Sequence, residues 1–459
     1  MEQITKPHCG ARLDRLPDCR WHSSMFAIVA FGLLVCWSNA VGGLILAQLK
    51  ALGWTDNSTT ATFSAITTAG MFLGALVGGI IGDKTGRRNA FILYEAIHIA
   101  SMVVGAFSPN MDFLIACRFV MGVGLGALLV TLFAGFTEYM PGRNRGTWSS
   151  RVSFIGNWSY PLCSLIAMGL TPLISAEWNW RVQLLIPAIL SLLATALAWR
   201  YFPESPRWLE SRGRYQEAEK VMRSIEEGVI RQTGKPLPPV VIADDGKAPQ
   251  AVPYSALLTG VLLKRVILGS CVLIAMNVVQ YTLINWLPTI FMTQGINLKD
   301  SIVLNTMSMF GAPFGIFIAM LVMDKIPRKT MGVGLLILIA VLGYIYSLQT
   351  SMLLITLIGF FLITFVYMYV CYASAVYVPE IWPTEAKLRG SGLADAVGRI
   401  SGIAAPYAVA VLLSSYGVTG VFILLGAVSI IVAIAIATIE IETKGVSVES
   451  LSIDAVVNK

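Results

Sequence analysis

Twelve long apolar stretches make up most of the chain, and they restrict its fold more than any other feature. A helix needs roughly 20 apolar residues to cross about 30 Å of hydrocarbon, and each stretch has about that length. None of them alternates apolar and polar residues as a membrane β-strand does. The sequence therefore predicts an all-α integral membrane protein with twelve transmembrane helices, at residues 25–49, 60–81, 90–107, 112–136, 149–171, 182–202, 266–290, 301–323, 330–348, 352–376, 392–414 and 418–439.

The basic residues gather in the loops of one side. Only 13% of the residues are charged, against about 25% in a soluble chain, and the net charge is +7. Lys and Arg accumulate in cytoplasmic loops, so the loops with Lys84, Arg143 and Lys325 and the basic segment 203–265 are expected in the cytoplasm, with both termini. This pattern accounts for the positive charge without nucleic acid. The expected location is the cell inner membrane, crossed many times.

The remaining polar chemistry indicates neither a metal site nor an enzyme. Five of the seven cysteines fall within predicted spans and suggest no disulfide framework. Cys9 and Cys19 lie near His8 and His22, but at the spacing of no zinc module. No phosphate loop and no nucleophile motif occurs in the sequence. We therefore expect no metal, no cofactor and no enzymatic activity.

Charged landmarks recur at an almost constant separation, which indicates a duplication. Asp324-Lys325 repeats Asp83-Lys84 after 241 residues, and Glu380 repeats Glu138 after 242 residues. Parallel repeats of this kind build transporters that hold a solute between two halves. We expect five parts: an N-terminal cytoplasmic segment, a six-helix bundle, a cytoplasmic linker with short surface helices, a second pseudo-symmetric six-helix bundle and a cytoplasmic tail, at residues 1–24, 25–202, 203–265, 266–440 and 441–459.

Several motifs resemble the major facilitator superfamily and its sugar-porter branch. They are GDKTGRR at 82–88, the run from Arg118 to Gly126, PESPRWL at 203–209, the paired sets Glu138/Pro141/Arg145-Gly146 and Glu380/Pro383/Arg389-Gly390, and Glu442-Thr443-Lys444-Gly445. The resemblance covers both halves. It implies a bacterial inner-membrane metabolite transporter that rocks between inward-open and outward-open states as a solute–proton symporter or a facilitator. The expected partners are a small polar solute and protons, and the expected state is a monomer.

The sequence departs from this branch at its sugar-binding positions. The two helix-7 glutamines are replaced by Ala275 and Met276, the helix-5 glutamine by Ser153 and the helix-10 tryptophan by Ala375. Sites that hydrogen-bond hydroxyl groups discriminate strongly, so these changes argue against the usual hexose or pentose. Helix 1 reads Trp37-Ser38-Asn39 where proton-coupled members carry an aspartate, which puts coupling through that position in doubt.

The loop 82–88 and its relatives are interpreted as a gating latch. A carboxylate at a helix end can pair with loop arginines and cap a neighbouring helix, and such contacts break when the halves rock. The alternative is positive-inside anchoring alone. The candidate latch residues are Asp83, Arg87, Arg88, Glu138 and Arg145 in the first half and Asp324, Arg328, Glu380 and Arg389 in the second.

Few ionisable residues fall within the apolar stretches, and each is a functional hypothesis. Arg118 is a candidate for substrate binding and proton coupling, with snorkelling to the interface as the alternative. Glu95 and His98, one turn apart, could relay a proton or form a satisfied pair near the interface. Asp395, a further proton-coupling candidate, is expected to pair with Arg399 one turn on.

A stripe of amides and aromatic residues on helix 7 predicts the wall of a solute cavity. Spacing of four residues places these side chains on one helix face, which suits a polar ligand, while hydrogen bonding between helices is the plain alternative. The substrate-binding candidates, besides Arg118, are Asn277, Gln280, Tyr281, Asn285 and Trp286 of helix 7, with Asn39, Asn157, Trp158 and Tyr160 opposite and Tyr369 and Tyr372 from helix 10. Pro161 and Pro288 are expected to kink their helices nearby.

The function expected is transport of a sugar derivative, polyol or sugar acid, with proton symport. A facilitated uniporter and an organic-anion symporter remain alternatives. A drug exporter is disfavoured because helix 5 has no glycine-proline-glycine motif, and a non-transporting sensor because it would usually carry a long cytoplasmic tail.

Overall fold

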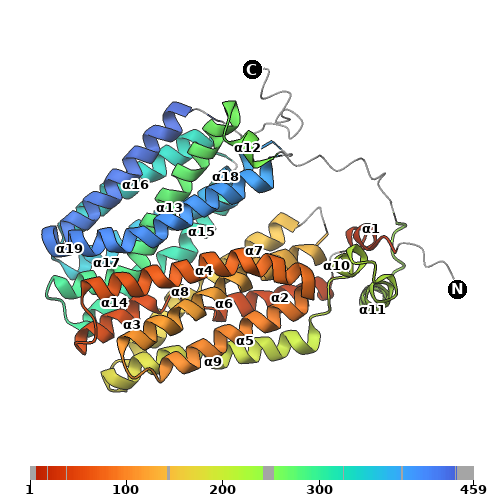
Figure 1. Ribbon diagram of the computed structural model, residues 1–459, viewed down its shortest axis with the longest axis horizontal. Helices are drawn as coiled ribbons and strands as arrows, with labels where there is room; N and C mark the ends of the chain where they lie inside the picture. The colour runs from red at the N-terminus through yellow and green to blue at the C-terminus, as the bar shows by residue number, and fades with distance from the viewer. Residues whose placement is uncertain are drawn as a thin grey trace. The chain divides into compact units, whose positions relative to one another are not determined.

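The computed structural model describes residues 7–17, 19–37, 39–141, 145–240, 253–323, 325–383, 386–439 and 441. Every regular element in these ranges is a helix (Figure 1). The chain divides into two compact units, and they do not follow the predicted six-plus-six boundaries. Unit 1 comprises Met1–Asn39, Gly70–Ser159 and Leu184–Gly246, and unit 2 the remainder. The predicted domain boundaries therefore stay a prediction.

Unit 1 contains α1 (Cys9–Asp14), α2 (Arg20–Val35), α5 (Arg87–Ala106), α6 (Met111–Tyr139), α7 (Arg145–Asn157), α10 (Pro206–Ser211) and α11 (Tyr215–Thr233). It also holds the second parts of α4 (Asn57–Thr85) and α9 (Ala176–Tyr201). Glycines let α4 lie directly on α6, because a Cβ atom on Gly74 would stand 2.1 Å from the Val123 carbonyl oxygen. Such close backbone contact is typical of helix pairs in membranes.

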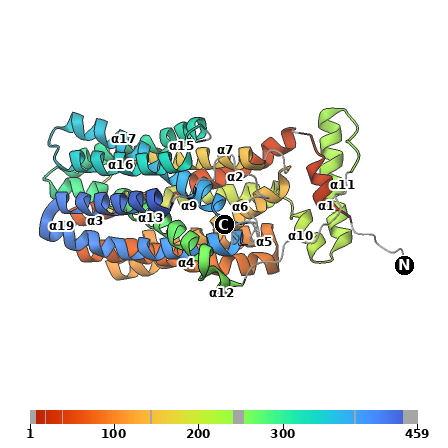
Figure 2. The same cartoon turned by 90° about the horizontal axis from the view of Figure 1, so that it is seen from above.

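Unit 2 contains α3 (Gly42–Ala51), α8 (Ser159–Leu170) from its second residue, α12 (Tyr254–Leu257), α13 (Gly260–Thr293), α14 (Leu298–Met309), α15 (Gly311–Val322), α16 (Arg328–Ser347), α17 (Met352–Val370), the π-helical turn η1 (Cys371–Tyr377), α18 (Val378–Glu380) and α19 (Lys387–Ile439). It also takes the first parts of α4 and α9. Figure 2 shows α16 and α17 running alongside each other in this unit.

Nine helical stretches of the described residues are long and apolar enough to cross a membrane, and one of them, Leu298–Val322, combines α14 and α15. The other predicted spans are present in altered form. The predicted helix 25–49 is divided into α2 and α3 because Cys36 leaves helical geometry, with ψ at 46°. The predicted helix 149–171 is divided into α7 and α8 around Trp158, three residues before Pro161, which has no N–H to donate. Two predicted spans run together as α19, where Gly417 at φ 65° marks the turn between them.

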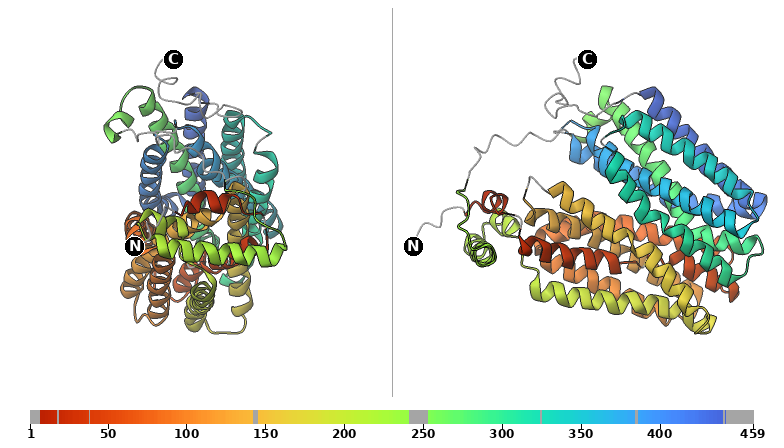
Figure 3. Two further views of the ribbon diagram at one scale, coloured as in Figure 1. Left: turned by 90° about the vertical axis from the view of Figure 1, so that its right-hand side faces the viewer. Right: turned by 180° about the vertical axis from the view of Figure 1, so that it is seen from behind.

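The first helix of the chain is docked on the linker helices (Figures 1 and 3). Cys9, Leu13 and Leu16 pack into an apolar cluster with Trp208 and Met222, so α1 lies against α10 and α11. Ion pairs fix the register of this contact: Arg12 Nη2 lies 2.7 Å from Glu226 Oε2, Arg15 Nη2 lies 2.6 Å from Glu226 Oε1, and Arg207 Nη2 lies 2.9 Å from Asp14 Oδ1. Residues 9–16 of the predicted N-terminal segment are therefore a structured part of unit 1.

Acidification should loosen this contact. Burial alone would raise the pKa of the Glu226 carboxyl, but Arg12 and Arg15 outweigh it and the net pKa lies below the ordinary 4.5. The stabilisation that this carboxylate adds is thus fully present above pH 4.5, and it is lost as the pH falls through the lower pKa of the folded state. We expect the backbone amides of α1 to exchange hydrogen several-fold faster at such pH, relative to their intrinsic exchange rate, and Glu226→Gln to show this faster relative rate at neutral pH. Glu217→Gln, which changes an exposed pair with Arg214, is the control and should leave the rate unchanged.

Candidate functional site

The loop between α4 and α5 is held by a cluster of ion pairs, the loop cluster (Asp83, Arg87, Glu138 and Glu204). Arg87 Nη1 lies 2.7 Å from Asp83 Oδ1, and Arg87 Nε lies 2.9 Å from Glu138 Oε1. Glu204 accepts hydrogen bonds from the backbone N–H groups of Arg87, at 2.7 Å, and Arg88, at 3.2 Å. It thereby caps the N-terminus of α5, where the helix dipole favours a negative charge.

The sequence did not single out Glu204, although the PESPRWL motif contains it. Its approach depends on Gly86, which has φ 98° and no side chain: a Cβ atom there would stand 2.2 Å from a Glu204 carboxylate oxygen. Trp208 of the same motif donates from Nε1 to the Asp83 carbonyl oxygen at 2.7 Å. The linker thus binds the loop at three points within unit 1.

Unit 2 carries an equivalent arrangement. Arg328 Nε lies 3.0 Å from Glu380 Oε2, and Arg328 Nη2 donates to Glu380 Oε1 at 3.1 Å. The Arg328 side chain is 6% exposed against 17% for Arg87, whereas the Glu380 side chain, at 34%, is more exposed than that of Glu138, at 21%. Arg389 instead lies 5.2 Å from the centre of the Tyr254 ring. Asp324 and the side chain of Arg145, both predicted latch residues, lie outside the described residues.

Inside unit 2, α3 and the N-terminal end of α4, both from the first half of the chain, pack against helices of the second half. We call this contact the seal (Gly43, Asn57, Ala61, Asn285 and Ser414). Asn57 Nδ2 donates to Ser414 Oγ at 2.9 Å, and Ala61 packs in one apolar cluster with residues of α13 and α19. A Cβ atom on Gly43 would stand 2.4 Å from the carbonyl oxygen of Ile284, next to Asn285. The two backbones therefore touch.

A polar and aromatic cluster within unit 2 joins α8, α13 and α17. The rings of Tyr160 and Tyr367 meet edge to face with centroids 5.3 Å apart. The Gln280 amide lies beside both tyrosine side chains, and the Tyr281 ring follows on α13, against Gly402. This cluster (Tyr160, Gln280, Tyr281 and Tyr367), which we call the polyol cluster after the solute proposed for it below, contains three predicted site residues. Sequence reasoning missed Tyr367, which lies two residues before the predicted Tyr369.

Other predicted cavity residues of unit 2 make internal contacts. Asn277 donates to the Leu273 carbonyl oxygen at 2.8 Å, and Tyr369 donates to the Val272 carbonyl oxygen at 3.1 Å. Tyr372 is fully buried and stacks on Tyr377 at 5.0 Å, while Trp286 is fully buried in the apolar cluster of the seal. Asn39, Asn157 and Trp158 belong to unit 1, where Asn157 Nδ2 donates to the Ser153 carbonyl oxygen at 2.8 Å. As substrate contacts, all of these stay predictions.

The ionisable residues within the spans are buried at different depths. Arg118 is 1% exposed on α6 and donates from Nη1 to the Met121 sulfur at 3.3 Å. Glu95 and His98 on α5 are both fully buried. On α19, Arg399 Nε lies 2.8 Å from Asp395 Oδ2, and that carboxylate side chain is 45% exposed.

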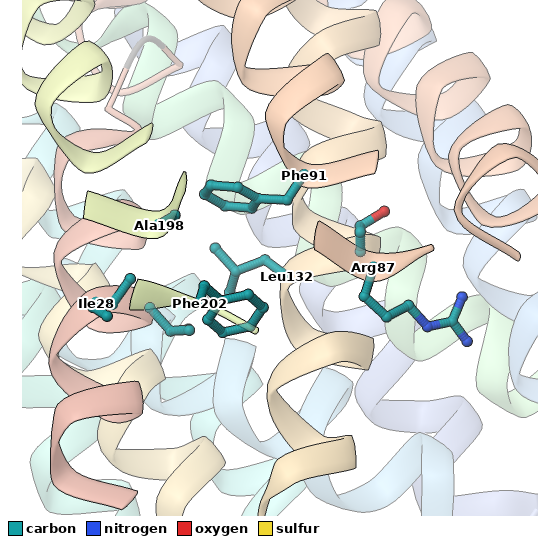
Figure 4. A pocket seen from close by; sticks show the side chains of 8 residues that line it. Ile28, Arg87, Phe91, Leu132, Ala198 and Phe202 are labelled. Atoms are coloured by element: carbon teal, nitrogen blue, oxygen red, sulfur yellow. The ribbon is translucent and has the colours of Figure 1, made fainter. Parts of the chain in front are cut away.

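One hollow of unit 1 lies beneath the loop cluster (Figure 4). Phe91, Leu132 and Phe202 surround it, and the guanidinium group of Arg87 points away from it. Its volume of about 10 Å³ is at the lower limit for a single water molecule. It is too small to hold a metabolite, and its apolar lining fits ordinary helix packing.

Comparison with known proteins decides the family. Residues 24–455 match the family described as "Sugar (and other) transporter". The chain belongs to this family of the major facilitator superfamily. The transporter is 44% identical over 455 residues to the inner membrane metabolite transport protein YdjE of Escherichia coli (strain K12), which covers 98% of this chain and 99% of the relative. It is 99% identical, over the full length of both chains, to the protein of the same strain that bears the name "Putative metabolite transport protein YdjK".

Solved structures show the same fold. The structure superposes on that of the xylose transporter XylE from E. coli in a partially occluded inward-open conformation, with a TM-score of 0.73 and 18% sequence identity. The match covers 93% of this chain and 100% of the XylE chain. This likeness confirms the predicted major facilitator fold. The family is one of membrane transporters and not of enzymes, as the sequence predicted.

Proposed function

We propose that the transporter moves a small polyhydroxylated metabolite, namely a sugar derivative, polyol or sugar acid, across the inner membrane by alternating access with proton symport. In this proposal the loop cluster and both termini face the cytoplasm, and the seal closes the opposite entrance. The basic loops support this orientation.

The polyol cluster is the observation that carries the proposal. Two tyrosine hydroxyl groups and one amide offer donors and acceptors side by side, and aromatic rings supply apolar faces for the C–H surface of a polyol. None of the three glutamines replaced by Ala275, Met276 and Ser153 is needed for this arrangement. The solute is therefore expected to differ from the common hexoses and pentoses.

Uptake into proteoliposomes tests the function. Purified protein should accumulate at least one member of a panel of sugars, polyols and sugar acids when the interior is alkaline, and not when the pH gradient is collapsed. Equilibration that ignores the gradient would replace symport by facilitated diffusion. Transport of no panel member, by protein that remains folded and monodisperse, would contradict the proposed solute class.

Substitutions in the polyol cluster locate the site. Gln280→Leu and Tyr367→Phe should each raise the KM of the transported solute by about 5-fold to 150-fold, because a buried solute hydroxyl loses its partner at a cost of about 1 to 3 kcal/mol. Tyr344→Phe is the matched control, since Tyr344 is 51% exposed on α16. An unchanged KM in both cluster variants would exclude these side chains from the site.

A further inference from the structure

Three titratable side chains of unit 1 meet between the end of α2 and α5, and none of them belongs to the polyol cluster. His98 Nδ1 lies 3.6 Å from Glu95 Oε2 and 4.0 Å from the Cys36 sulfur. Glu95 and His98 are both 0% exposed. Among the described residues, neither carboxylate oxygen of Glu95 has a hydrogen-bond partner. A buried carboxyl group in this situation is costly unless it is protonated or lies beside a positive charge.

The charged and titratable groups around the pair are few. On α6 the residue that faces His98 is Gly124, whose Cβ position lies 3.0 Å from the His98 backbone nitrogen. The same helix carries Cys117, which lies against Gly105, and Arg118, which contacts Met121. Residues 70–82 of α4 contain no titratable side chain, and α2 contributes none near the pair apart from Cys36 just beyond its end.

Cys36 lies at the break between α2 and α3, close to one of the places where the chain passes from one unit to the other. It begins the break between α2 and α3, and the unit boundary falls at Asn39–Ala40 within this break. A change of charge on Glu95 or His98 therefore acts next to the break between α2 and α3.

We propose that Glu95 and His98 together form the proton-binding site of this transporter. The inference rests on the proposed symport and assigns its coupling step to α5. With one proton the pair has no net charge, either as carboxyl and imidazole or as carboxylate and imidazolium. Loss of that proton leaves one buried negative charge on the pair in the low-dielectric interior. A second proton would leave a buried positive charge and is disfavoured.

One proton is exchanged in each cycle. Water on the outer side supplies the proton to the pair, and the pair releases it to water on the inner side after the transporter has changed to its inward-open state. No other bond is made or broken. The charge of the pair changes beside the break between α2 and α3. Protonation therefore favours one conformation of this break, and deprotonation favours the other.

Infrared titration of the purified, full-length protein tests the site without any solute. The wild type should show a carboxyl C=O band whose intensity changes with pH. Glu95→Gln should remove this band, and His98→Gln should shift its midpoint in protein that remains monodisperse. Glu177→Gln, which changes an exposed carboxylate on α9, should leave the band intact. A titrating band that survives in Glu95→Gln with the wild-type midpoint would overturn the assignment.

Transport separates failure of this site from failure of the proposed function. Glu95→Gln should still exchange labelled for unlabelled solute across the membrane but lose accumulation driven by the pH gradient. Accumulation that persists in Glu95→Gln and is lost in Asp395→Asn would place the coupling site on α19 and overturn the proposal, while symport itself would stand. If the wild type moves no solute of the panel, the infrared result decides the site alone.

Discussion

Gly43→Leu should abolish most transport while leaving the fold intact. The Gly43 backbone touches Ile284 in the seal, where a Cβ atom would stand 2.4 Å from the carbonyl oxygen and a side chain has no room. Overpacking of this kind costs about 1 to 3 kcal/mol. The cost falls only on the state in which the seal is closed, so it shifts the equilibrium toward the outward-open state by about 5-fold to 150-fold.

Two measurements check this prediction. Gradient-driven uptake should fall by a similar factor, and a cysteine introduced as Ser414→Cys should react faster with a membrane-impermeant maleimide in the Gly43→Leu background. Gly79→Leu is the matched control, because a Cβ atom at Gly79 would meet nothing within 4 Å. Normal uptake and unchanged labelling in Gly43→Leu would show that the seal does not close tightly during transport.

Glu380→Gln should destabilise the protein more than Glu138→Gln. Removal of one partner of a buried ion pair costs about 3 to 5 kcal/mol, because the other charge stays buried. The Glu380 side chain is 34% exposed, which lowers the expected loss to about 2 kcal/mol. When Glu138 is neutralised, Arg87 keeps its ion pair with Asp83, so its charge is not left without a partner. The Arg87 side chain is also more exposed than that of Arg328, at 17% against 6%, although Glu138, at 21%, is less exposed than Glu380. We therefore expect Glu138→Gln, in the first half of the chain, to lower the free energy of unfolding by about 1 kcal/mol or less.

Thermal unfolding in detergent, with a double-mutant cycle, measures the difference. Arg328→Gln and Glu380→Gln should couple strongly, and the double variant should recover part of the loss. Glu217→Gln, in an exposed pair with Arg214, should change stability by no more than about 0.5 kcal/mol. Equal losses in Glu138→Gln and Glu380→Gln would refute the proposed asymmetry of the two halves.

Much of the fold could be predicted because a long apolar stretch without alternation can cross a membrane only as a helix. The spans at 60–81 and 112–136 appear as parts of α4 and α6, and the repeated Asp-Lys and Glu landmarks indicated the duplication. The breaks were harder to predict. The helix ends at Cys36, where the sequence has no proline or glycine that would predict a break. The backbone geometry of Cys36 therefore depends on tertiary contacts.

The candidate site was predictable in part, for similar reasons. Periodicity placed Gln280 and Tyr281 on helix 7, but the partner Tyr367 comes from a helix whose apolar pattern does not distinguish it from Tyr369. Tyr369 reaches a backbone carbonyl oxygen, and Tyr367 meets Tyr160. Which face of a buried helix looks toward another depends on packing between distant segments. The role of Glu204 required the position of Gly86, 118 residues earlier in the chain.

The docking of α1 on α11 also has a consequence for how the protein is made. Arg12 and its partner Glu226 are separated by 214 residues, so α1 leaves the ribosome long before α11 exists. At about 5 to 20 residues per second, the first helix waits roughly 10 to 40 seconds for its binding site. During that time the spans of the first half must enter the membrane. Closure of this contact therefore marks the moment at which the first half of the chain has been completed.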